Sequence, residues 1–115
     1  MKTLLLLIVM GLQAAAIPMP REIEHLLQYL SDSGCQYVRN GTEHSAQDAV
    51  AHIRKKARYF ADDIDSTERF IELSASKSTL SGKSYSIRCP GQPEQSSNAW
   101  LNAELKRYRR TQPAQ

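Results

Sequence analysis

The sequence contains one segment with strict two-residue alternation, Ser84-Tyr85-Ser86-Ile87-Arg88-Cys89. Tyr85, Ile87 and Cys89 fall on one side of an extended chain, and the residues between them are polar or charged. This pattern predicts a β-strand with one buried face. The run Pro90-Gly91-Gln92-Pro93 ends the strand, because proline and glycine favour turns over strands.

The first 16 residues have the three-part layout of a secretory signal peptide. Lys2 gives a positive start, an apolar run covers residues 4–12, and Ala14-Ala15-Ala16 fits a small-residue cleavage site. The apolar run is short for a membrane-spanning helix, so a retained anchor is the alternative interpretation. We therefore expect cleavage near Ala16, export, and no transmembrane segment after cleavage.

Export determines how Cys35 and Cys89 are interpreted. In an oxidising compartment a lone pair of cysteines is most simply a disulfide. A redox-active or metal-binding pair is the alternative, but the two cysteines lack C-x-x-C spacing. The bridge would place strand 84–89 beside a second short strand at 35–39. Asn40-Gly41 then predicts a two-residue hairpin turn into a return strand at 42–44.

Four further segments have the spacing of amphipathic helices. Serine or aspartate stands at the expected start of three of them, where such side chains cap helices. The expected helices are residues 21–31, a helix behind Ser45 that reaches Phe60, a helix capped by Asp65 or Ser66 that reaches about Ala75, and a last helix capped by Ser96 or Ser97 that reaches Tyr108.

The sequence thus predicts the α+β class. Residues 22–110 form one domain with a small antiparallel sheet of two to three strands, about four helices packed on it and one disulfide. Pro18 and Pro20 predict an extended leader over residues 17–21, and residues 111–115 are expected to be a flexible tail.

Composition excludes several classes of protein. The chain has 115 residues, which is too short for a TIM barrel or a full Rossmann fold. Its hydrophobic content of 41% and charged content of 23% are ordinary for a globular domain. A net charge of +3 is too mild to indicate nucleic-acid binding.

The sequence shows no catalytic constellation and no metal motif. His25, His44 and His52 do not have metal-ligand spacing, and no serine stands in a nucleophile-elbow context. The acidic residues near 62–68 lack the glycine and the bidentate glutamate of an EF-hand loop. We expect no catalytic residue, no metal and no cofactor.

Two surfaces are candidates for binding. Arg54, Lys55 and Arg58 form a candidate anion-binding face on the second helix, for which a solvated helix face is the alternative. The other candidate is a binding loop that leads into the disulfide-tethered strand, and it comprises Ser81, Gly82, Lys83 and Tyr85. In the alternative interpretation, Gly82 only makes a turn and Tyr85 packs in the core.

The chain resembles an uncharacterised family of short exported proteins of Gram-negative bacteria, catalogued as a domain of unknown function. The resemblance covers about Glu22 to Tyr108, and its departures are His44, where relatives are often aromatic, and Ser84, where they often carry proline. It implies a periplasmic protein with no assigned activity. The residues that carry it are Ser33-Gly34-Cys35, Arg39-Asn40-Gly41, His52, Lys56, Phe70-Ile71, Ala75-Ser76, Ser81-Gly82, Tyr85, Cys89 and Trp100-Leu101.

A second resemblance is confined to Ser81-Gly82-Lys83-Ser84-Tyr85, which is similar to the S-G-x-x-Y loop of periplasmic lysozyme inhibitors. In that family the loop enters the lysozyme cleft and meets its catalytic carboxylates. Those inhibitors are rich in β-structure, whereas this chain is predicted to be mainly helical.

Three functions follow as hypotheses. The first is a non-catalytic periplasmic binding or accessory module whose partner is an unknown protein or cell-envelope component. The second is an inhibitor of a lysozyme-type cell-wall hydrolase that acts through Ser81–Tyr85. The third is a small unrecognised enzyme, which would need a pocket with perturbed titratable groups near His52, Ser81 or Tyr85.

Overall fold

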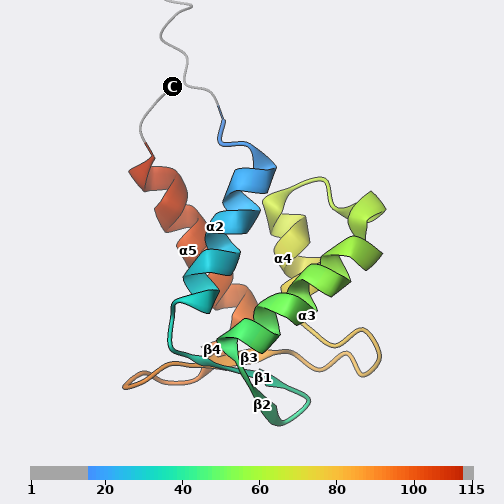
Figure 1. The fold of residues 1–115 in the computed structure, drawn as a ribbon, viewed down its shortest axis with the longest axis vertical. Coiled ribbons are helices and arrows are strands. Elements are labelled where there is room, and N and C mark those ends of the chain that lie inside the picture. The colour runs from blue at the N-terminus through green and yellow to red at the C-terminus, as the bar shows by residue number, and fades with distance from the viewer. Residues whose placement is uncertain (1–15, 113–115) are drawn as a thin grey trace, which may run out of the picture.

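A computed structural model describes residues 16–112 and has the α+β fold predicted from the sequence (Figure 1). The signal peptide expected at residues 1–16 falls almost wholly outside the described residues. The elements, in chain order, are α2 (Met19–Ser31), β1 (Gln36–Arg39), β2 (Thr42–Ser45), α3 (Ala46–Tyr59), the 3-10 turn η1 (Ala61–Asp63), α4 (Thr67–Ala75), β3 (Ser86–Arg88), β4 (Gln95–Ser96) and α5 (Ser97–Thr111).

The sheet is antiparallel throughout and has the strand order β2-β1-β3-β4. Tyr37 pairs with Ile87 at its centre, and both side chains are fully buried. The hairpin between β1 and β2 turns through Asn40 and Gly41, whose φ angles of 50° and 79° are those required by the two-residue turn that the sequence predicts.

The sheet has four strands, so the prediction of two to three strands is corrected by β4. This strand is only two residues long, and both Gln95 and Ser96 are exposed. These two exposed polar residues show no alternation of apolar and polar side chains, so the sequence gives no sign of a strand here. They form a strand because β3 presents its free edge to them, with Ser86 opposite Ser96.

The helices gather on one side of the sheet, with α2 and α5 side by side and α3 packed against α4 (Figure 1). Serine caps begin three of them, because Ser45, Ser66 and Ser96 each accept a hydrogen bond from the backbone N–H three residues on. The apolar faces meet in one core, whose fully buried large side chains include Leu26, Leu30, Tyr37, Ile53, Phe70, Ile71, Ile87 and Leu105.

The expected extended leader at residues 17–21 is wrong from Met19 onward, because α2 begins there. Pro18 precedes the helix and Pro20 lies in its first turn. The first backbone N–H groups of a helix have no partner within it, so a proline there loses no hydrogen bond. At the other end, α5 extends through Thr111, and most of the expected tail lies outside the described residues.

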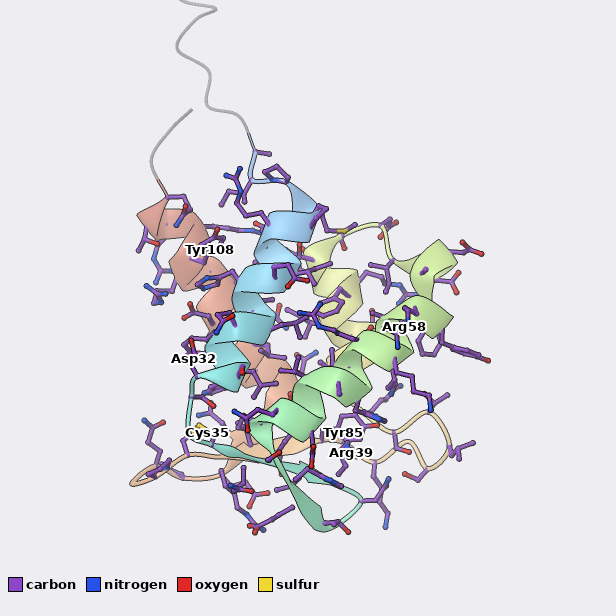
Figure 2. The ribbon with its side chains drawn as sticks, in the orientation of Figure 1. Asp32, Cys35, Arg39, Arg58, Tyr85 and Tyr108 are labelled. Carbon is purple, nitrogen blue, oxygen red and sulfur yellow. A yellow bond between two sulfur atoms is a disulfide. The ribbon has the colours of Figure 1, made fainter. Side chains whose placement is uncertain are left out.

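The disulfide between Cys35 and Cys89 is present, as predicted. Cys35 immediately precedes β1 and Cys89 immediately follows β3, next to the paired residues Gln36 and Arg88. The bridge therefore holds the two central strands together at the point where the chain passes from α2 to the sheet, which Figure 2 shows at Cys35.

Two carboxylates are buried between the helices, where the apolar spacing gives no sign of them. Glu22 accepts hydrogen bonds from Arg109 and Thr67, and Glu104 accepts them from Arg107 and lies 2.6 Å from His25. The Glu22–Arg109 and His25–Glu104 contacts join α2 to α5, whose residues are far apart in the sequence. Burial of both carboxylates is balanced by charged hydrogen-bond donors.

Candidate functional site

A cavity of about 490 Å³ opens between α3, the end of β1 and the loop at residues 77–84. Its volume lies within the roughly 300–1,000 Å³ range usual for small-molecule sites. We call it the basic cavity, and it is lined by Arg39, Asn40, His52, Lys55, Lys56, Tyr59, Phe60, Ser78, Thr79, Leu80 and Tyr85. Figure 2 shows Arg39 and Tyr85 near one another below α3, beside this loop.

One face of α3 supplies the helical wall of the basic cavity. His52, Lys55, Lys56 and Tyr59 follow each other at spacings of three, one and three residues, so they share one side of the helix. The buried side of the same helix carries Ala49 and Ile53. The packing of α3 on the core therefore turns the four polar and aromatic residues toward the loop.

The facing loop is held by its own hydrogen bonds. Ser78 donates its N–H to the carbonyl of Lys83, and Gly82 donates its N–H to the carbonyl of Ser78. Gly82 has a φ of 73°, a conformation that favours glycine. The Ser81 hydroxyl donates to the Asn40 side chain at 2.8 Å, which ties the loop to the β1–β2 hairpin.

Four side chains meet at the inner end of the basic cavity. The Lys56 ammonium donates to the Tyr85 hydroxyl at 3.3 Å and to the Lys77 carbonyl at 2.7 Å. The Nε2 atom of His52 lies 3.4 Å from the Tyr85 hydroxyl and 3.4 Å from an Arg39 guanidinium nitrogen. Because arginine only donates hydrogen bonds, this contact requires Nε2 to be an acceptor, which makes His52 neutral.

The electrostatics of the cluster agree with a neutral His52. Burial, followed by the positive charges of Arg39 and Lys56, lowers the pKa of His52 from 6.5 to about 4. Burial and the Arg39 charge also lower the pKa of Lys56. Both pKa shifts arise because several positive charges share a partly buried site. The described lining of the basic cavity contains no acidic residue that would offset them.

The His52 environment predicts a loss of stability between pH 6.5 and pH 4. A pKa that folding depresses gives stability that is fully present above the unfolded value and is lost as the pH falls through the folded value. The unfolding free energy from urea titrations is therefore expected to fall from pH 7 to pH 5 in the wild type. The unfolding free energy of His52→Gln should fall less over the same pH range. The other charged or titratable groups that act on His52 are Arg39, Lys56, His44 and Lys55, and they remain in both proteins.

A decline of equal size in His52→Gln would contradict this assignment. Below pH 4.5 both proteins should lose further stability. Glu22 and Glu104, whose pKa values are lowered chiefly by hydrogen bonds from Arg109 and Arg107, become protonated there. That second decline serves as an internal control, because the substitution leaves it in place.

The structure divides the candidate anion-binding face between two sides of α3. Lys55 lines the basic cavity, whereas Arg54 forms a two-bond ion pair with Glu24 at 2.7 and 2.8 Å. Arg58 borders a different hollow, beside Ile23 and Phe70. All three residues lie away from the apolar face of the helix, and that property does not distinguish its two flanks.

The candidate binding loop is also divided. Ser81, Gly82 and Lys83 are exposed, whereas Tyr85 is only 3% exposed and presents its hydroxyl to His52 and Lys56. Tyr85 thus packs in the core, as in the alternative interpretation, while its polar end reaches the basic cavity.

Several cavity residues were not predicted from the sequence, and they include Arg39, Lys56, Tyr59 and Leu80. The spacing of His52, Lys55, Lys56 and Tyr59 is a signal that sequence reasoning could have used, because it defines one helix face. No local signal brings Arg39 or Leu80 to that face, since each comes from another part of the chain.

The described residues 16–112 hold no group of three histidine, cysteine or carboxylate side chains placed to bind a metal ion. Among the same residues, no helix has both the length and the apolar character needed to cross a bilayer.

Comparison with known sequences assigns the chain to a family. The sequence model of the family of unknown function DUF5329 matches residues 18–109, which covers every helix and strand described above except the C-terminal end of α5. The chain belongs to the DUF5329 family.

One relative of this DUF5329 protein is the uncharacterized protein YfeK of Salmonella typhimurium, a Gram-negative bacterium. The two are 43% identical over 49 residues, which is 43% of this chain and 41% of the relative. The match thus spans less than half the length of either protein. No solved structure matches the DUF5329 chain.

Five of the residues on which the resemblance rests line the basic cavity of the DUF5329 chain, and the others lie elsewhere in the fold. Arg39 and Asn40 come from the first strand and its turn, His52 and Lys56 from α3, and Tyr85 from the segment before β3. These positions are distributed over almost half the chain, and only the fold brings them together.

Proposed function

We propose that this protein is an exported, periplasmic, non-catalytic binding module that holds a small anionic ligand in the basic cavity. The observation that carries the proposal is the gathering of Arg39, Lys55 and Lys56 around one cavity whose described lining has no acidic residue. None of these three cations forms an ion pair with a described carboxylate. A bound anion would therefore give them a negative partner that the described residues do not supply.

The chemistry of the lining suits a phosphate, sulfate or carboxylate group. Lys56 is partly withdrawn from solvent, and Coulomb attraction grows as water is excluded. Guanidinium and ammonium groups form charge-assisted hydrogen bonds with such anions. Asn40 and the Tyr85 hydroxyl add uncharged donors.

Periplasmic location is supported by the Cys35–Cys89 bridge, since structural disulfides persist in oxidising compartments. It is also supported by the signal-peptide layout of residues 1–16.

Titration with inorganic phosphate tests the binding proposal. The wild type is expected to bind saturably with a dissociation constant in roughly the millimolar range. The double variant Lys55→Gln/Lys56→Gln should bind about tenfold more weakly, because it loses charged hydrogen-bond donors. Amide NMR shifts of the loop residues Ser78 and Thr79 report the binding, and circular dichroism confirms that the variant is folded.

Arg58→Gln is the matched control, because it removes one positive charge from the same helix outside the basic cavity. Its affinity for phosphate should stay within about twofold of the wild type. Equal weakening by Arg58→Gln, or no saturable binding by the wild type, would contradict the proposal.

Inhibition of a lysozyme-type cell-wall hydrolase is a second candidate function. It is favoured by the exposure of Ser81, Gly82 and Lys83 on a loop that is held by internal hydrogen bonds. A lysozyme assay tests it. Inhibition that is lost in Lys83→Glu would support this function, and unchanged lysozyme turnover at micromolar protein would remove it.

A small enzyme is the third candidate. It is favoured by the neutral His52 imidazole beside the Tyr85 hydroxyl in a cavity, since such groups can transfer protons. The described lining offers no carboxylate to orient His52, which favours binding over catalysis. Turnover of a phosphate ester that His52→Gln abolishes would reverse this order.

A further inference from the structure

Two large apolar side chains stand exposed at the mouth of the basic cavity. Tyr59, at the end of α3, is 80% exposed, and Leu80, in the loop opposite, is 99% exposed. They are the exposed large hydrophobic residues of the described chain, and both line this cavity. Phe60 also lines the cavity, packs against Tyr59 with ring centroids 4.9 Å apart, and is half-buried.

Their common position is informative because single exposed apolar residues are ordinary on protein surfaces, whereas apolar residues that line the same cavity are typical of ligand-binding sites. The loop that carries Leu80 is closed by the bonds Ser78 N–H to Lys83 carbonyl and Gly82 N–H to Ser78 carbonyl. The fold therefore holds Leu80 in solvent.

The polar and apolar parts of the basic cavity are separated in depth. Arg39, Lys56 and the Tyr85 hydroxyl meet at its inner end, where the side chains are buried or half-buried. Tyr59 and Leu80 lie at the outer end, where exposure is greatest. A ligand that satisfies both parts has an anionic group at one end and an apolar chain at the other.

We infer that the ligand of the basic cavity is a single anionic amphiphile, with its charged head against Arg39 and Lys56 and its alkyl chain across Tyr59 and Leu80. This inference rests on the proposed anion-binding function and names its ligand class. A discrete molecule is favoured over a flat bilayer surface, because Arg39 and Lys56 are half-buried while the apolar Tyr59 and Leu80 are exposed.

Alkyl phosphates of increasing chain length, used below their critical micelle concentrations, test the inference. Inorganic phosphate and butyl phosphate measure binding of the head, and octyl phosphate adds the chain. A fully buried methylene strengthens binding by about fourfold, and the mouth buries the chain only partly, so octyl phosphate should bind at least about tenfold more tightly than butyl phosphate.

The variants Leu80→Ser and Tyr59→Ser separate the chain from the head. Both residues are exposed, so their replacement should leave the fold intact. Together they are expected to abolish the advantage of octyl phosphate while leaving the affinity for inorganic phosphate unchanged. Leu80→Met, which keeps an apolar side chain, is the matched control and should retain that advantage.

Each alternative outcome is distinguishable. If inorganic phosphate and octyl phosphate bind equally, the amphiphile inference is overturned and the anion site stands. If octyl glucoside binds as well as octyl phosphate, the head makes no contribution and the inference fails. If vesicles of anionic phospholipid bind while monomeric octyl phosphate does not, the surface is a membrane contact. If none of the probes binds, the proposed function fails with it.

Discussion

Replacing Cys35 with serine is expected to lower the free energy of unfolding by about 4 kcal/mol while the fold is retained. The bridge joins residues 54 positions apart, and closing a loop of that length removes roughly this much chain entropy from the unfolded state. Domains of this size have total stabilities of about 5–15 kcal/mol. The disulfide is therefore a large part of what keeps the protein folded.

Urea unfolding, followed by the fluorescence of the single tryptophan, Trp100, measures the effect. The double variant Cys35→Ser/Cys89→Ser is the control, because it loses the bridge without leaving a free thiol. It should unfold at nearly the same urea concentration as Cys35→Ser. An unfolding midpoint of the wild type that is insensitive to a thiol reductant, under conditions that reduce the bridge, would contradict the prediction.

Replacing Arg109 with methionine is expected to lower the unfolding free energy by about 3 kcal/mol at pH 7. Arg109 donates two hydrogen bonds to Glu22, at 2.7 and 2.9 Å, and Glu22 is 4% exposed. Removing one partner of a buried ion pair leaves the other charge without compensation, which costs about 3–5 kcal/mol. The Arg109 side chain is itself 39% exposed, which places the expected value at the lower end.

Arg69→Met is the matched control, since Arg69 forms an exposed pair with Glu72 within α4. Such surface pairs contribute at most about 1 kcal/mol, so this variant should be nearly as stable as the wild type. A second comparison uses Glu22→Met/Arg109→Met, which removes both charges and should recover much of the lost stability.

The Arg109 effect also has a predicted dependence on pH. Hydrogen bonds from Arg109 lower the pKa of Glu22, so its contribution is present above pH 4.5 and is lost as the pH falls further. The stability difference between the wild type and Arg109→Met should therefore shrink in acid. A difference that is constant from pH 7 to pH 3 would show that Arg109 acts only through packing.

Features encoded by neighbouring residues were predicted well. Ser45 starts a helix because its hydroxyl accepts a hydrogen bond from the backbone only three residues away, and Ser66 and Ser96 do the same. The Asn40-Gly41 turn depends on two backbone conformations that these residues adopt readily. The central pairing of β1 with β3 followed from the two cysteines that flank it.

Features that depend on distant partners were predicted poorly. β4 consists of two exposed polar residues, and it is a strand only because β3 lies beside it. Glu22 occupies the edge of an apolar helix face, which by itself indicates a solvated carboxylate. Its burial depends on Arg109, 87 residues later. Pro20 on its own predicts an extended chain, but its place in the first turn of α2 permits a helix.

The sequence by itself determined three helix starts, the β1–β2 hairpin, the bridge and the family resemblance, because these depend on contacts within a few residues or on the two cysteines of the chain. Only the tertiary structure decided which cations share a cavity. In the sequence, nothing separates Lys55 from its charged neighbours Arg54 and Arg58. In the fold, the packing of α3 on the core places Lys55 in the cavity that Arg39 and Leu80 also line. Arg54 and Arg58 border a different hollow. Packing decides which cation lies in the cavity, because the residues around a position do not indicate where a distant loop and strand will lie.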